Sequence, residues 1–122
     1  MTYCAALKMN DHLIFMSDTR TNAGVDNISK FRKMFTWSVP GERVITLMTA
    51  GNLATTQAVV SLLDERSKAP EERDPTLLQV PTLFQAARLI GETLSEVVNS
   101  HAEDGQRAEA SFGATLIMGG QI

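Results

Sequence analysis

The sequence of 122 residues lacks the features that define several protein classes. It has a single cysteine, Cys4, which excludes an intrachain disulfide and leaves no cysteine pair to bind a metal. Lysine and arginine number 11 against 14 aspartates and glutamates, and the net charge of -3 provides no basic stripe of the kind that binds a phosphate backbone. We therefore expect no nucleic-acid partner, no metal and no cofactor.

Long apolar runs are also missing. No segment approaches the ~18 apolar residues of a membrane-spanning helix. Lys8, Asn10 and Asp11 interrupt the N-terminal region where a signal peptide would be continuously apolar. These absences predict a cytoplasmic protein with no membrane segment, while the apolar content of 43% suffices for one buried core.

A first β-hairpin is predicted at the N-terminus. The apolar segments 3–9 and 13–17 flank an Asn-Asp pair, residue types that tolerate the left-handed geometry of a two-residue turn. Such a turn makes the numbers of facing residues sum to 21. Thr2 then lies opposite Thr19, and Asp18 lies beside the N-terminus.

A second hairpin is predicted from segments 33–39 and 43–48, joined by a Pro-Gly turn at positions 40 and 41. A two-residue turn here gives a sum of 81 and sets Lys33 opposite Met48. The second segment is almost entirely apolar, which is typical of a central strand covered on both faces.

The remaining segments predict two helices and a final strand. The first helix follows Gly51 and ends at the charged loop 67–75, and the second starts near Pro81. A strand over 110–118 follows, with Gly119-Gly120 as its end. Strands grouped first and helices grouped next predict an α+β fold with a mainly antiparallel sheet. The second helix is expected to direct one apolar face to the core, formed by Leu83, Phe84, Ala87, Ile90, Leu94, Val97 and Val98.

Lys33 is the least conventional residue of this pattern. Side chains alternate along a strand, so Lys33 shares a face with the bulky apolar residues of its strand, Trp37 among them. A charged lysine on such a face is costly unless it is paired. If the two hairpins lie side by side, Asp18 is its natural partner, close to the N-terminal hydroxyl residue and the strand-end glycine Gly51.

Four segments of the sequence also resemble the β-type subunits of proteasomes, and within them the bacterial Anbu, or ancestral β-subunit, proteins. The segments occur in the order and spacing of that family. They are MTY at 1–3, SDTRTNAGVDN at 17–27, FRKM at 31–34 and TAGNLATTQ at 49–57.

The resemblance implies an N-terminal-nucleophile hydrolase with a four-layer αββα sandwich. Residues 1–122 would form the N-terminal part of one such domain, truncated at the C-terminus to about the first half of the fold. Thr2, exposed once Met1 is removed, would be the nucleophile, with its own amine as the base. Asp18 and Lys33 would adjust the reactivity of the Thr2 nucleophile, and the backbone N–H of Gly51 would stabilise the oxyanion.

The resemblance also assigns supporting roles. Arg20 would support the catalytic residues without contacting the substrate. Thr21 or Asn22, together with Thr49, would bind the substrate as an added strand. The loop between Asp18 and the catalytic lysine is one residue shorter than the family pattern, which leaves the choice between Thr21 and Asn22 open. The family's later serine and aspartate would fall beyond the last residue of this sequence.

Three functions follow from this reading. The first is a threonine-type endopeptidase subunit that cleaves peptides or unfolded protein within a self-assembled, ring-like homo-oligomer. The second is a non-catalytic assembly or scaffold subunit of the same fold. The third is an N-terminal-nucleophile amidase that acts on small amides.

Overall fold

The computed structural model describes residues 3–22, 28–68, 76–103 and 113–122. Within these ranges the chain forms seven strands and two helices. In chain order they are β1 (Cys4–Lys8), β2 (Leu13–Ser17), β3 (Arg20–Asn22), β4 (Ile28–Lys30), β5 (Met34–Val39), β6 (Arg43–Gly51), α1 (Leu53–Lys68), α2 (Leu83–Glu103) and β7 (Ala114–Gln121).

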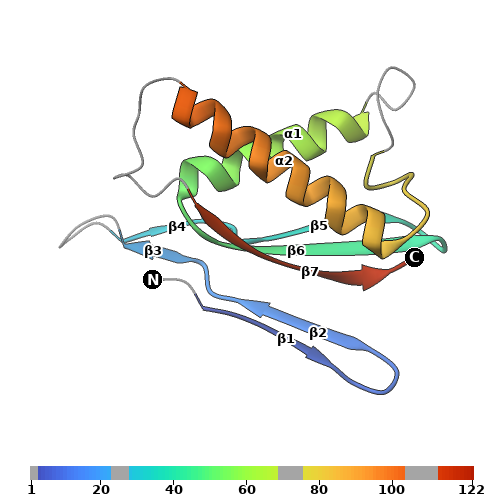
Figure 1. Ribbon diagram of the computed structural model, residues 1–122. Coiled ribbons are helices and arrows are strands. Elements are labelled where there is room, and N and C mark those ends of the chain that lie inside the picture. Colours follow the sequence, from blue (N-terminus) through green and yellow to red (C-terminus); the bar gives the residue numbers. More distant parts are fainter. Residues whose placement is uncertain (1–2, 23–27, 69–75, 104–112) are drawn as a thin grey trace.

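The elements are arranged in layers. Strands β5, β6 and β7 form an antiparallel sheet with β6 in the centre, and α1 and α2 lie across one face of it (Figure 1). The β1–β2 hairpin lies on the opposite side of that sheet, and β3 pairs with β4. This is the α+β fold that the order of strands and helices predicts.

The core lies between the helices and the three-stranded sheet. Ile45 and Leu47 of β6 are fully buried and pack with Val59 and Leu63 of α1. Met48, whose side chain alternates to the other face of β6, is also buried. Burial of successive residues on both faces of β6 confirms the prediction of a central strand. At one side of this core the indole N–H of Trp37 donates to Asp64 Oδ1 at 2.7 Å, which ties β5 to α1.

The first hairpin has the predicted register. Cys4 pairs with Ser17 and Lys8 with Leu13, and the Met9 N–H donates to the His12 carbonyl at 2.9 Å. The two-residue turn is therefore correct, and with it the approach of the N-terminal strand to Asp18.

The predicted register of the second hairpin is wrong by one residue. Val39 pairs with Arg43, and the Glu42 N–H donates to the Val39 carbonyl at 3.0 Å. Gly41 has a φ of 75°, which a type II turn with proline in its second position requires. Because this turn leaves Glu42 as an extra residue, the loop has three residues, and Lys33 faces Thr49 instead of Met48.

Helix α1 extends past the predicted boundary, through Ser67 to Lys68; residues 69–75 of the predicted loop lie outside the described residues. Helix α2 begins at Leu83, which confirms the predicted start near Pro81. Thr82 caps its first turn, because its hydroxyl accepts the Gln85 N–H at 3.2 Å.

The predicted apolar face of α2 is partly wrong. Phe84 is 77% exposed and Ala87 is also exposed, whereas Ala86 is fully buried. The buried line of α2 runs through Ala86, Ile90, Thr93 and Val97. The apolar pattern missed this line because one of its members, Thr93, is polar. The Thr93 hydroxyl donates to the Leu89 carbonyl at 2.8 Å, which allows this side chain to lie in the core.

The final strand does not end at Gly119-Gly120. Strand β7 runs to Gln121 and pairs with β6 along its whole length, while residues 110–112 of the predicted strand lie outside the described residues. These glycines leave room for neighbours: a Cβ at position 119 would collide with the Phe15 ring, and one at 120 with the Val44 carbonyl. The two glycines therefore allow β2 and β6 to approach β7 closely.

Candidate active site

Asp18 and Lys33 form an ion pair at the junction between the first hairpin and the main sheet. Lys33 Nζ lies 2.5 Å from Asp18 Oδ1. The lysine side chain is 7% exposed and the aspartate side chain 37% exposed, so the pair opens to solvent on the carboxylate side. The alternation of side chains along the strand correctly predicted that Lys33 points inward, and the Asp18 carboxylate balances its positive charge.

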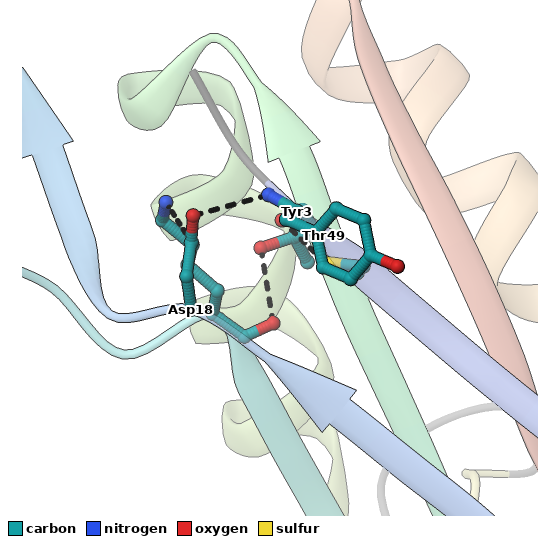
Figure 2. Close-up of polar contacts among 5 residues, drawn as sticks. Tyr3, Asp18 and Thr49 are labelled. Carbon is teal, nitrogen blue, oxygen red and sulfur yellow. Dashed lines mark hydrogen bonds and ion pairs between the residues drawn. The ribbon is translucent and has the colours of Figure 1, made fainter.

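The same carboxylate holds the N-terminal strand. Asp18 Oδ2 accepts the Tyr3 N–H at 3.1 Å, and the Asp18 N–H donates to the Tyr3 carbonyl at 3.0 Å (Figure 2). The Tyr3 nitrogen belongs to the peptide bond that joins Thr2 to Tyr3. Thr2 itself lies outside the described residues, and the residue next to it is fixed to Asp18 by two hydrogen bonds.

These contacts set the charge state of Asp18. The hydrogen bond from Lys33 holds the pKa of the Asp18 carboxyl below its ordinary value and outweighs the opposing effect of partial desolvation. The Tyr3 N–H and the positive charge of Lys33 lower the pKa further. Asp18 is therefore a carboxylate at neutral pH, and it orients the amine of Lys33 as its hydrogen-bond donor.

Thr49 joins β6 to this centre. It is 3% exposed, its N–H donates to the Lys33 carbonyl at 2.9 Å, and its hydroxyl lies 3.5 Å from the same oxygen. Its own carbonyl accepts the Cys4 thiol at a sulfur–oxygen distance of 3.8 Å. Thr49 thus contacts both β1 and the residue before β5; a role in substrate binding stays a prediction.

Cys4 lies beside the site, through its thiol contact with the Thr49 carbonyl; the sequence indicated a small core residue of the first strand rather than a nucleophile, but not this position. Burial raises the pKa of the Cys4 thiol, and the negative charge of Asp18 raises it further. Cys4 is therefore a protonated contact between the sheets rather than a thiolate. Strand alternation could have found it, because positions 2 and 4 of an N-terminal strand share a face.

Gly51 ends β6 two residues after Thr49 and adopts a φ of 106°, which a residue with a side chain rarely adopts. A Cβ at this position would lie 2.8 Å from the Gly113 carbonyl oxygen. The next residue, Asn52, caps α1 by accepting the Thr55 N–H on its side-chain oxygen at 3.0 Å. Gly51 is therefore an obligatory glycine at the predicted junction of strand and helix.

Arg20, Thr21 and Asn22 form β3, immediately after the Asp18 turn. Thr21 pairs with Ser29 of β4 in an antiparallel register. Among the strands that the structure describes, β4 is the only partner of β3, so β3 has one edge on which a further strand could pair. The side-chain contacts of these three residues lie outside the described part of the structure.

Within the described ranges, no group of three or more histidine, cysteine, aspartate or glutamate side chains is placed to hold a metal ion. None of the described helices combines the length and apolarity needed to cross a membrane.

Solved structures with the same fold belong to Anbu proteins. Anbu from Yersinia bercovieri is 45% identical with a TM-score of 0.84, and the match covers 100% of this chain and 48% of that one. The Anbu complex of Pseudomonas aeruginosa, solved as a helical assembly, is 41% identical with a TM-score of 0.85 and the same coverages. A Gly-1 mutant of Anbu from Hyphomicrobium sp. strain MC1 is 43% identical, with a TM-score of 0.83 and coverages of 100% and 47%.

No protein-family model and no curated protein matches the sequence. The structural matches define a proteasome-type fold, as the resemblance of the four sequence segments predicted. The chain belongs to the Anbu, or ancestral β-subunit, family. It spans about half the length of the solved Anbu chains that it matches.

Proposed function

We propose that this chain belongs to a threonine-type endopeptidase subunit in which Thr2, freed by removal of Met1, is the nucleophile. The observation that carries the proposal is the pair of contacts made by Asp18. One carboxylate oxygen binds the Lys33 amine at 2.5 Å, and the other accepts the N–H of Tyr3 at 3.1 Å. The residue after Thr2 is thus held beside a buried cation.

The proposed chemistry is acyl transfer to a threonine. The Thr2 hydroxyl oxygen attacks the carbonyl carbon of the scissile peptide bond, while its proton passes to the Thr2 α-amino group. The tetrahedral intermediate then expels the amine of the leaving peptide, which takes up that proton. Water attacks the resulting ester in the second half of the reaction, and the α-amino group again serves as the base.

Lys33 acts in this scheme through its charge. An α-amino group has a pKa of ~7.7 to 8.0 when unperturbed, and a nearby cation favours its neutral, basic form. Asp18 keeps the lysine in place through its hydrogen bond to the Lys33 amine. The N–H of Gly51 stabilises the oxyanion, which is commonly the largest single contribution in such sites.

Substrate binding is assigned to the strand edge beside this centre. An extended peptide pairs with β3 at Thr21 or Asn22 and approaches β6 near Thr49, so main-chain hydrogen bonds give affinity without fixing a sequence preference. Arg20 supports the catalytic residues from the start of β3. We further propose a cytoplasmic subunit that self-assembles into a ring-like homo-oligomer; the Pseudomonas aeruginosa relative was solved as a helical assembly.

The proposal is tested by hydrolysis of fluorogenic peptides and of small amides by the assembled protein. We expect peptide cleavage that is abolished by Thr2→Ala and retained in part by Thr2→Ser, which keeps a hydroxyl nucleophile. Cleavage of small amides alone would indicate an amidase. Absence of any cleavage in an assembled sample with a free Thr2 would indicate a scaffold subunit.

A further inference from the structure

Arg32 is an exposed cation beside the candidate site that the proposed chemistry does not use. It stands between two residues that are fixed to other segments of the site. The Phe31 N–H donates to the Thr19 carbonyl at 2.7 Å, and the Lys33 carbonyl accepts the Thr49 N–H at 2.9 Å. Arg32 therefore lies between the turn that joins β2 to β3 and the end of β6, where the substrate is proposed to bind.

The Arg32 side chain follows the outer edge of β5. A backbone hydrogen bond joins Thr49 to Lys33, so the next pair of the antiparallel ladder, Met34 and Met48, is one whose backbone groups point away from each other. The Met34 carbonyl thus lies on the side of β5 that is remote from β6, and it accepts the Arg32 Nε–H at 2.8 Å. This hydrogen bond fixes one end of the guanidinium at the strand edge.

The rest of the guanidinium lies over an aromatic ring. Its Cζ atom is 5.2 Å from the centroid of the Phe35 ring, which is the geometry of a cation–π contact. Side chains alternate along a strand, so Phe35 shares a face with the buried Lys33 and with Trp37. The charge of Arg32 is therefore held near the face of β5 that bears the proposed catalytic cation.

This charge is not balanced by an anion within the described residues. No ion pair of that part of the chain includes Arg32, and neither of its terminal nitrogens has a hydrogen-bond partner there. Lys33, in contrast, is paired with the Asp18 carboxylate. The whole chain carries a net charge of -3, so a local excess of positive charge at the site does not follow from its composition.

We propose that Arg32 is a specificity-determining residue that binds a carboxylate side chain of the substrate, so that the site favours peptides with aspartate or glutamate close to the scissile bond. The terminal nitrogens of a guanidinium match the two oxygens of a carboxylate. A guanidinium that is already held in place also loses little conformational freedom on binding. The inference rests on the proposed function, because it requires an extended peptide beside β3 and Thr49.

The test measures peptide binding to the assembled Thr2→Ala protein, which lacks the proposed nucleophile, by fluorescence anisotropy. The peptides are extended, labelled and otherwise uncharged, and a single glutamate is moved through successive positions. Each peptide has a partner with glutamine at the same position. We expect one position, or two adjacent positions, at which glutamate binds about 5-fold more tightly than glutamine, the upper range for an exposed ion pair.

Variants of Arg32 assign the preference to its side chain. Arg32→Gln should abolish it, and Arg32→Lys should retain part of it, because lysine keeps the charge without the planar fork. Arg32→Glu should reverse it in favour of lysine at the same position. Each preference is a ratio of two affinities for one protein, so a loss of stability in a variant does not change it.

Arg88→Gln is the matched control and should leave the preference unchanged. Arg88 is 70% exposed in the first half of α2, and α2 begins at the end of the main sheet opposite to the start of α1 (Figure 1). Equal affinities for glutamate and glutamine at every position would overturn the proposal, as would a glutamate preference that survives Arg32→Gln.

Peptide cleavage by the protein that retains Thr2 is measured separately, so the two proposals fail in different ways. Absence of cleavage together with a glutamate preference that depends on Arg32 would contradict the catalytic proposal and support this one. Cleavage with no such preference would support the catalytic proposal and overturn this one.

Discussion

Lys33 and Asp18 are 15 positions apart in the sequence and meet at 2.5 Å, with the lysine buried and the aspartate facing the N-terminal strand. The contact joins the two hairpins at one point. A lysine at this depth requires a fixed anion, and the same anion also holds Tyr3, the first described residue of the N-terminal segment. One carboxylate therefore has this structural role together with the catalytic role proposed for it.

Removing the lysine charge should impair the reaction more than the fold. We expect Lys33→Ala to lower the rate of Thr2 acylation by at least about 100-fold, because the cation that favours a neutral Thr2 amine is lost. The measurement is the second-order rate of inactivation by a β-lactone. Lys8→Ala, which removes an exposed lysine from β1, serves as the control and should react at the wild-type rate.

Stability should fall in acid through Asp18. Its pKa is lowered in the folded state, so its contribution to stability is fully present above the unfolded pKa of ~3.9 and is lost as the pH falls through the folded value. We expect the urea midpoint to decrease below a pH of about 4 more steeply in wild type than in Asp18→Asn. Equal slopes in wild type and Asp18→Asn would contradict the assignment.

Gly51 should tolerate no side chain. Gly51→Ala combines a φ of 106° with a Cβ 2.8 Å from the Gly113 carbonyl oxygen, and we expect a loss of roughly 1–3 kcal/mol in the free energy of unfolding. Gly91→Ala is the matched control, since no neighbour lies within 4 Å of the added carbon and the site is inside α2. There alanine should stabilise by about 0.5–1 kcal/mol. Denaturant unfolding of both variants measures the contrast.

Cys4 should react slowly with alkylating reagents. Because its pKa is raised, the thiolate fraction at pH 8 is smaller than that of an ordinary cysteine. We expect iodoacetamide to modify Cys4 more slowly in the folded protein than in urea, followed by intact mass. Rapid modification of the folded protein would show that the thiol is ionised and would call for a reassessment of its contact with Thr49.

The sequence predicted local features best where one short-range rule decides them. The Asn-Asp turn correctly predicted the register of the first hairpin, and the alternation of side chains along a strand correctly predicted that Lys33 is buried. The second register was missed because Pro40-Gly41 suits a type II turn, which adds Glu42 to the loop.

Features that depend on distant contacts were not predictable from local pattern. Gly119 was interpreted as the end of a strand, whereas the ring of Phe15, on another sheet, explains its lack of a side chain. Phe84 fits the helical apolar period but points to solvent, because packing of α2 against the sheet favours Ala86 and Ile90. In the site, the pairing of Asp18 with Lys33 required the assumption that the two hairpins lie close together. The structure has this contact, but the first hairpin is stacked on the sheet that contains the second.

Covalent labelling of the N-terminal threonine tests the central claim most directly. The assembled protein is treated with a β-lactone or an epoxyketone, and the modified residue is mapped by mass spectrometry after confirmation that Met1 is absent. The account predicts a single adduct on Thr2 that is lost in Thr2→Ala and strongly reduced in Lys33→Ala. Retention of Met1, or an adduct on Cys4 with none on Thr2, would contradict it.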